Sequence, residues 1–91
     1  MKSTTQINTT EAARIAKRLL NHWKHKFEVS ETEHDFSIFM PDATVILIPE
    51  SDVLRVSIES QLNDLSHLEK VVLDHLNRMA QQEFTALWAH E

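Results

Sequence analysis

Apolar residues recur every three or four positions in two segments of the chain, and this spacing predicts two amphipathic helices. At the start of the first segment, Asn8 is expected to cap the helix, with Glu11 at the N3 position. This helix should end near His25, where the regular spacing stops. Its apolar stripe consists of Ala12, Ile15, Ala16, Leu19 and Trp23.

The second helix should begin at Asn63 or Ser66 and run to about Gln82. Ser66 and Glu69 have the spacing of a capping box, in which each side chain bonds a backbone N–H of the other residue. At about 100° per residue one face of this helix is apolar, and His75 lies in the middle of that face. The apolar residues there are Leu65, Leu68, Val71, Val72, Leu76 and Met79.

The chain between the two helices alternates apolar and polar residues, which predicts strands. One of the segments, Val45–Ile48, is instead continuously apolar, so we expect a central strand that is covered on both faces. After the second helix, residues 84–89 alternate again and predict a closing strand. The four segments between the helices are residues 27–30, 35–40, 45–48 and 54–59.

The order of these elements, α-β-β-β-β-α-β, predicts an α+β fold. We expect a two-layer sandwich in which an antiparallel sheet of four or five strands carries both helices on one face. The length of 91 residues suits a single domain spanning residues 1–91. Residues 1–7 are expected to be a loosely ordered N-terminal segment.

The chain contains no glycine and no cysteine, and these two absences exclude several classes of function. Phosphate-binding loops, the dinucleotide fingerprint and the nucleophile elbow all need glycine at fixed positions. Without cysteine there is no thiol nucleophile, disulfide, thiolate zinc site or iron–sulfur cluster. No apolar run is long enough for a membrane span, and the first residues do not resemble a signal peptide, so a cytoplasmic location is expected.

The charge is unevenly distributed along the chain. Residues 1–26 carry six basic residues and one acidic residue, whereas residues 27–91 carry three basic and thirteen acidic residues. The basic residues on the polar face of the first helix favour docking onto an acidic protein partner, or onto the acidic part of another copy. No aromatic residue lies among them, so nucleic-acid binding is not expected. An ordinary solvated helix face is nevertheless the favoured interpretation of these basic residues. The residues of this docking face are Arg14, Lys17, Arg18 and Lys24.

His75 has two interpretations. It is either a core histidine, bonded to a backbone carbonyl or a carboxylate, or a ligand or acid–base group in an apolar pocket. Arg78 and Glu83 follow it closely in the sequence and could complete a polar network or form the wall of a binding site. The structural network is the favoured interpretation.

His22 and His25 are three residues apart and could share a helix face, as the ligands of a metal ion often do. Two imidazoles make an incomplete site, so His75 is the candidate third ligand. This set of His22, His25 and His75 would belong to a metal sensor or a small metal-dependent enzyme. No catalytic residue is assigned, because no serine, histidine and acid have a recognisable arrangement. Neither His67 nor His90 receives a role.

Two short motifs resemble those of a known bacterial family. Residues 75–83 read H-L-x-R-x-A-x-x-E and are followed by Trp88, which resembles the C-terminal signature of domain of unknown function 2218. Residues 22–26 read H-x-x-H-K and resemble the N-terminal histidine block of that family. Three positions depart from its usual residues, namely Met79 (phenylalanine), Gln82 (arginine) and the hairpin Pro41-Asp42 (glycine).

The resemblance implies a small bacterial domain that is found beside or fused to siderophore-interacting reductases, and hence an association with iron handling. Our leading hypothesis is therefore a non-enzymatic accessory or binding module with such a reductase as its partner. The alternatives are the metal-binding protein described above, and a structural interaction domain that dimerises through a sheet edge or the basic helix. No cofactor other than a metal ion is expected.

Overall fold

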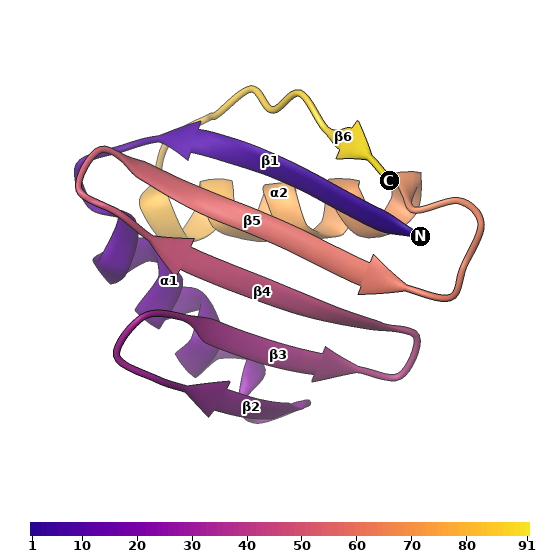
Figure 1. Ribbon diagram of the computed structural model, residues 1–91. Coiled ribbons are helices and arrows are strands. Elements are labelled where there is room, and N and C mark those ends of the chain that lie inside the picture. Colours follow the sequence, from indigo (N-terminus) through magenta and orange to yellow (C-terminus); the bar gives the residue numbers. More distant parts are fainter.

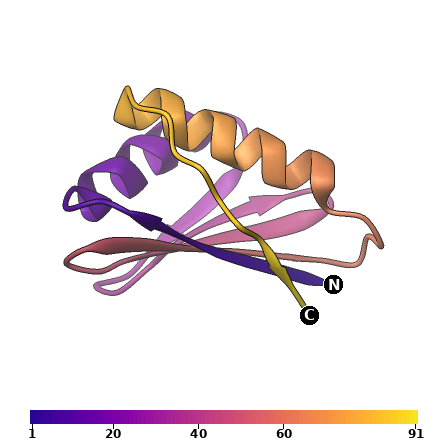
Figure 2. The same cartoon turned by 90° about the horizontal axis from the view of Figure 1, so that it is seen from above.

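Two helices lie on one face of a single antiparallel sheet in the computed structural model, which describes residues 1–91 (Figure 1). Seen from above, both helices are on the same side of the strands (Figure 2). The α+β two-layer architecture predicted from the sequence is thereby confirmed. The elements are β1 (Lys2–Asn8), α1 (Ala12–Trp23), β2 (Glu28–Glu31), β3 (Phe36–Met40), β4 (Ala43–Pro49), β5 (Val53–Ser60), α2 (Ser66–Ala80) and β6 (Ala89–His90).

The sheet has six strands in the order β2-β3-β4-β5-β1-β6, rather than four or five. The additional strand is β1, so the prediction of a loosely ordered segment at residues 1–7 is wrong. β1 lies between β5 and β6, with Thr5 opposite Val56. The alternation in β1 is inconspicuous because two of its inward positions, Ser3 and Thr5, are polar yet buried. Both hydroxyl groups donate a hydrogen bond, to the Glu69 carboxylate and to the Leu87 carbonyl, which makes this burial tolerable.

α2 begins at Ser66, one of the two predicted positions, but the other helix ends differ from the prediction by a few residues. Asn8 belongs to β1 and does not cap α1. Directly before α1, the Glu11 N–H donates a hydrogen bond to the Thr9 hydroxyl. At the other end, α1 stops at Trp23, so His25 lies in the turn that follows. α2 ends at Ala80, and Gln81 directly after it takes a left-handed conformation with φ of 56°, the conformation that glycine would favour.

The hydrophobic core fills the space between the helices and the sheet. We call this side of the sheet the covered face, and inward residues such as Ile38, Leu47 and Ile58 are fully buried there. β4 is a central strand, as predicted, but only one of its faces is covered. Val45 and Leu47 are buried, whereas Ile46 and Ile48 point to the opposite side and are half-buried. The continuous apolar run therefore faces the core with every second residue only.

The C-terminal segment is extended and runs beside β1 (Figure 1). Only Ala89 and His90 pair with β1 as a strand, so the predicted closing strand is shorter than expected. Its alternation is nevertheless real, because Trp88 packs against the edge of the core and Leu87 is 93% exposed. Neither helix has the length and hydropathy that crossing a membrane requires.

Candidate functional site

His75 of α2 is half-buried and lies against α1, beside the side chains of His22 and Trp23. Its ring centroid is 4.8 Å from that of Trp23 and 5.5 Å from that of His22. The Nδ1 atom is 2.7 Å from the carbonyl oxygen of Val71, so this nitrogen carries the proton and donates it to the carbonyl. In the neutral imidazole with this tautomer, the lone pair is on Nε2.

Arg78 and Glu83 do not join this histidine. No hydrogen bond or ion pair links either residue to His75, and both are exposed. For Glu83 the physical reason is the end of α2 at Ala80, since the left-handed Gln81 turns the chain away before Glu83. Arg78 lies within α2, but it is exposed to solvent. The predicted polar network of His75, Arg78 and Glu83 is therefore not formed.

Of the three predicted metal ligands, the structure brings His22 and His75 together. His25 lies in the exposed turn after α1, because the helix ends two residues before it. No group of three histidine, aspartate or glutamate side chains is placed to hold one metal ion. The metal site remains a prediction for which the chain itself supplies two neighbouring ligands.

A shallow hollow of about 530 Å³ opens beside these histidines, between the C-terminal ends of the two helices. We call it the basic groove, because arginines and histidines line it and no carboxylate does. The Arg18 guanidinium donates to the carbonyl oxygen of Met79 at 2.9 Å, which fastens α1 to the end of α2. The guanidinium of Arg78 forms neither a hydrogen bond nor an ion pair within the chain. The lining residues are Arg18, Asn21, His22, His25, Arg78, Met79 and Gln81.

The predicted docking face overlaps the basic groove only in part. Arg14 forms an ion pair with Glu11 at 3.0 Å, and Lys17 forms one with Glu31 at 2.5 Å. These acids neutralise the first half of the α1 surface. The unpaired positive charge lies further along, at Lys24 and in the basic groove.

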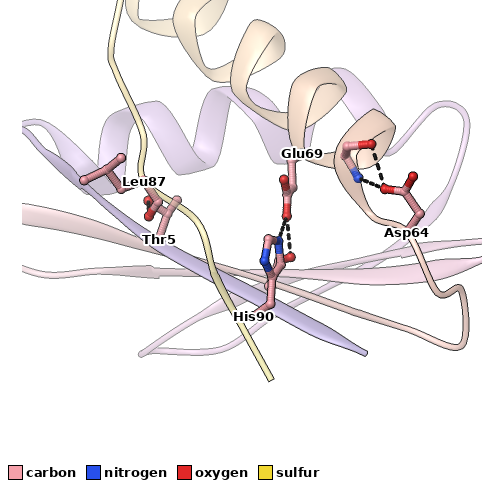
Figure 3. Close-up of polar contacts among 7 residues, drawn as sticks. Thr5, Asp64, Glu69, Leu87 and His90 are labelled. Carbon is pink, nitrogen blue, oxygen red and sulfur yellow. Dashed lines mark hydrogen bonds and ion pairs between the residues drawn. The ribbon is translucent and has the colours of Figure 1, made fainter.

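A second polar cluster, which the sequence did not reveal, joins three segments that are far apart in the chain. Glu69 of α2 is only 9% exposed and accepts two hydrogen bonds at Oε2. One comes from the hydroxyl of Ser3 in β1 and the other from Nε2 of His90 in β6, each at 2.5 Å. Figure 3 shows the Glu69 carboxylate pointing from the helix toward His90. We call these three residues the Glu69 cluster.

Glu69 was assigned to a capping box with Ser66, and this assignment is wrong. The N–H and hydroxyl of Ser66 both bond to Oδ1 of Asp64 instead. The hydrogen bond from the Ser66 hydroxyl lowers the pKa of Asp64 below its ordinary value, and the bond from the Ser66 N–H lowers it further. A signal for the burial of Glu69 was present, because it shares the three- and four-residue spacing of Leu65, Val72 and Leu76.

The arrangement of the Glu69 cluster is that of a structural link between α2 and two strands rather than that of a catalytic triad. In a serine hydrolase the imidazole stands between the serine and the acid, so that it can take the serine proton. Here the carboxylate stands in the middle, and the Ser3 hydroxyl donates to it rather than to the imidazole. Ser3 is also fully buried. The cluster thus ties β1 and β6 to the first turns of α2.

Comparisons with known proteins identify relatives but no activity. A model of the family described as an uncharacterized protein conserved in bacteria (DUF2218) matches residues 4–88. The chain is similar to the NMR structure of PA4090 from Pseudomonas aeruginosa, with 38% identity and a TM-score of 0.81, over 97% of this chain and 94% of that one. No curated protein matches the chain.

Proposed function

This chain belongs to DUF2218, a family of uncharacterized proteins conserved in bacteria, and we propose the following function for it. The function is that of a non-enzymatic accessory module that binds an acidic surface of a partner protein through the basic groove. The observation that supports it is the composition of that groove, where Arg18, Arg78 and two histidines gather without a carboxylate.

The contrast with the rest of the molecule strengthens this proposal. The chain carries a net charge of −5, so an acidic partner is repelled by most of its surface. The basic groove is the place where the sign of the charge is reversed and where a guanidinium, that of Arg78, is free to bind a carboxylate. Docking of this kind orients the partner and accelerates association, and it weakens as the ionic strength rises.

The partner that we propose is a siderophore-interacting reductase, as the family resemblance implies. The module would then serve iron handling by holding such a reductase, without taking part in the electron transfer. The architecture of the Glu69 cluster is in keeping with a role outside catalysis, since its serine is neither activated nor accessible.

An NMR titration tests the proposal with two probes, a decaglutamate peptide and a purified bacterial siderophore-interacting reductase. We expect the largest amide shifts at Asn21, His22 and Gln81, and a loss of affinity of about tenfold or more between low and physiological salt. The variant Arg78→Glu should abolish binding, whereas Lys70→Glu makes the same charge change outside the basic groove and should not. Shifts confined to other surfaces, or equal losses in both variants, would refute the proposal.

Binding of a divalent cation is a second candidate function, favoured by the pairing of His22 with His75. The Val71 carbonyl fixes the tautomer of His75 and leaves Nε2 free to bind a metal, as carbonyl groups often do for metal-bound histidines. The remaining ligands would be water or a group of the docked partner. We expect zinc to raise the melting temperature of the wild-type chain, and His75→Gln to remove that increase. The absence of any increase in the wild type would exclude this candidate.

A further inference from the structure

The face of the sheet that carries no helix, which we call the open face, contains a broad hollow. This hollow measures about 690 Å³ and lies over β4, β5, β1 and the C-terminal segment. Outward side chains of the strands form its floor and rims, and side chains of residues 85–89 form one wall. The basic groove lies on the other side of the molecule, among the helices, so the two sites share no lining residue.

The strand register explains why the open face is hollow. Ser57 of β5 lies opposite Ile46 on one side and Thr4 on the other, and Thr4 lies opposite Ala89. Small side chains therefore follow one another across three neighbouring strands, from Ser57 to Ala89. The rows before and after them contain the longer side chains of the pairs Lys2 with Glu59 and Gln6 with Arg55. The result is a trough that crosses the strands.

Apolar groups at both ends of this trough are incompletely covered within the chain. Ile46 and Ile48 stand at the β4 end and are half-buried, although β4 is a central strand. At the other end, Leu87 is 93% exposed. The Ser57 hydroxyl between them is shielded from water and lacks a hydrogen-bond partner. Exposed apolar side chains with a polar rim are typical of an interaction surface.

We propose that the open face binds a second copy of this chain, face to face, about a two-fold axis that runs parallel to the strands between β5 and β1. Aligned packing of two sheets within about 30° is one of the two usual arrangements of sheet on sheet. The axis exchanges β5 with β1 and β4 with the C-terminal segment. Each outward residue therefore faces a known residue of the second copy.

The side chains that this axis brings together are complementary. Ile48 faces Leu87 of the second copy, and Ile46 faces Ala89, so the uncovered apolar groups at the two ends cover each other. Glu59 faces Lys2 of the second copy, and the symmetry repeats this contact. Within one chain, Lys2 and Glu59 are neighbours across β1 and β5, yet no ion pair joins them. No like charges are set opposite each other.

The size of the surface predicts a weak dimer. Four strands spaced about 4.8 Å apart, with four rows of outward side chains, cover roughly 20 by 20 Å, or on the order of 400 Å² per copy. The total buried area would be below about 1,200 Å², as in transient complexes. The Glu69 cluster supports this surface indirectly, because it holds the segment that carries Leu87 and Ala89 beside β1.

Sedimentation equilibrium of the untagged chain from about 10 μM to about 1 mM tests the proposal. We expect the mass to rise from that of one chain, 10.6 kDa, toward that of two. Leu87→Glu should weaken association by at least about tenfold without lowering the melting temperature, because this side chain is exposed. The matched control is Leu62→Glu, which changes another exposed leucine outside the open face.

A charge exchange tests the orientation of the two copies. Glu59→Lys should weaken the dimer, and the double variant Lys2→Glu/Glu59→Lys should restore it, since the pairs across the proposed axis are then reversed together. A mass of one chain over the whole concentration range would overturn the proposal, as would unchanged dimerisation of Leu87→Glu. Rescue of Glu59→Lys by Arg55→Glu rather than by Lys2→Glu would overturn the proposed axis.

Discussion

The two faces of the sheet are built from alternate residues of the same strands, yet their surroundings differ completely. On the covered face Leu47 and Val45 are fully buried beneath the helices. On the open face Ile46 and Ile48, their immediate neighbours in β4, are only half-buried. The comparison teaches that an apolar run in a strand does not by itself show what covers it. The covered face supplies the stability of the fold, and the open face is the surface that we propose for dimerisation.

Shortening neighbouring side chains of β4 tests most directly whether the two faces differ in their contribution to stability. Leu47→Ala should lower the free energy of unfolding by about 2–5 kcal/mol, because it leaves a cavity in the core. Ile48→Ala should lower it by less than about 1 kcal/mol, because that side chain is already partly in water. Urea denaturation at low protein concentration measures both. Equal losses would show that the two faces do not differ in burial.

Removing the buried carboxylate should have the next largest effect. Glu69→Ala leaves the Ser3 hydroxyl without its partner and releases His90, so we expect a loss of about 1–3 kcal/mol. Hydrogen exchange should also become faster at the amides of β6, which Lys70→Ala, an exposed neighbour, should leave unchanged. Unaltered exchange in Glu69→Ala would mean that the cluster does not hold the C-terminal segment.

The end of the covering helix α2 offers a stabilising change. Gln81 takes a left-handed conformation with φ of 56°, which a residue with a Cβ atom adopts less readily than glycine. Gln81→Gly should therefore raise the free energy of unfolding by about 1 kcal/mol, as measured by thermal and urea denaturation. Gln82→Gly is the matched control and should be neutral or destabilising. A loss of stability in Gln81→Gly would show that the end of the helix is held differently.

The smallest effect is expected at the start of the same helix and should depend on pH. Hydrogen bonds from Ser66 lower the pKa of Asp64 in the folded state below its ordinary value of 3.8. The stability from these bonds is therefore complete above about pH 4 and is lost as the pH falls through the lowered pKa. Asp64→Asn should reduce this acid dependence slightly in melting curves recorded between neutral and acidic pH. An unchanged pH profile would contradict the assignment.

Much of the fold could be read from periodicity alone, because the relevant contacts are repeated at regular spacing. The neighbouring strands β3, β4 and β5 were predicted to within two residues at each end, and both helices were placed. β1 was missed for the opposite reason. Its inward hydroxyls at Ser3 and Thr5 do not contrast with their neighbours, and the groups that satisfy them are 66 and 82 residues away.

The candidate sites were less predictable than the fold. The sequence singled out Arg18, His22, His25 and Arg78 in different connections, but only the packing of α1 on α2 gathered them into one groove. The expected link from His75 to Glu83 failed because a single left-handed residue redirected the chain. His90, to which no role was given, proved to be a partner of the one buried carboxylate.

The order of residues thus determined which segments are helical, which are extended and which side of each is apolar, since those properties depend on neighbours a few positions away. Only the tertiary structure decided that a polar N-terminal strand enters the interior of the sheet, and that the carboxylate of Glu69 is buried where α2 packs on that strand. These outcomes depend on partners distant in the chain, whose hydrogen bonds and burial are created by folding itself.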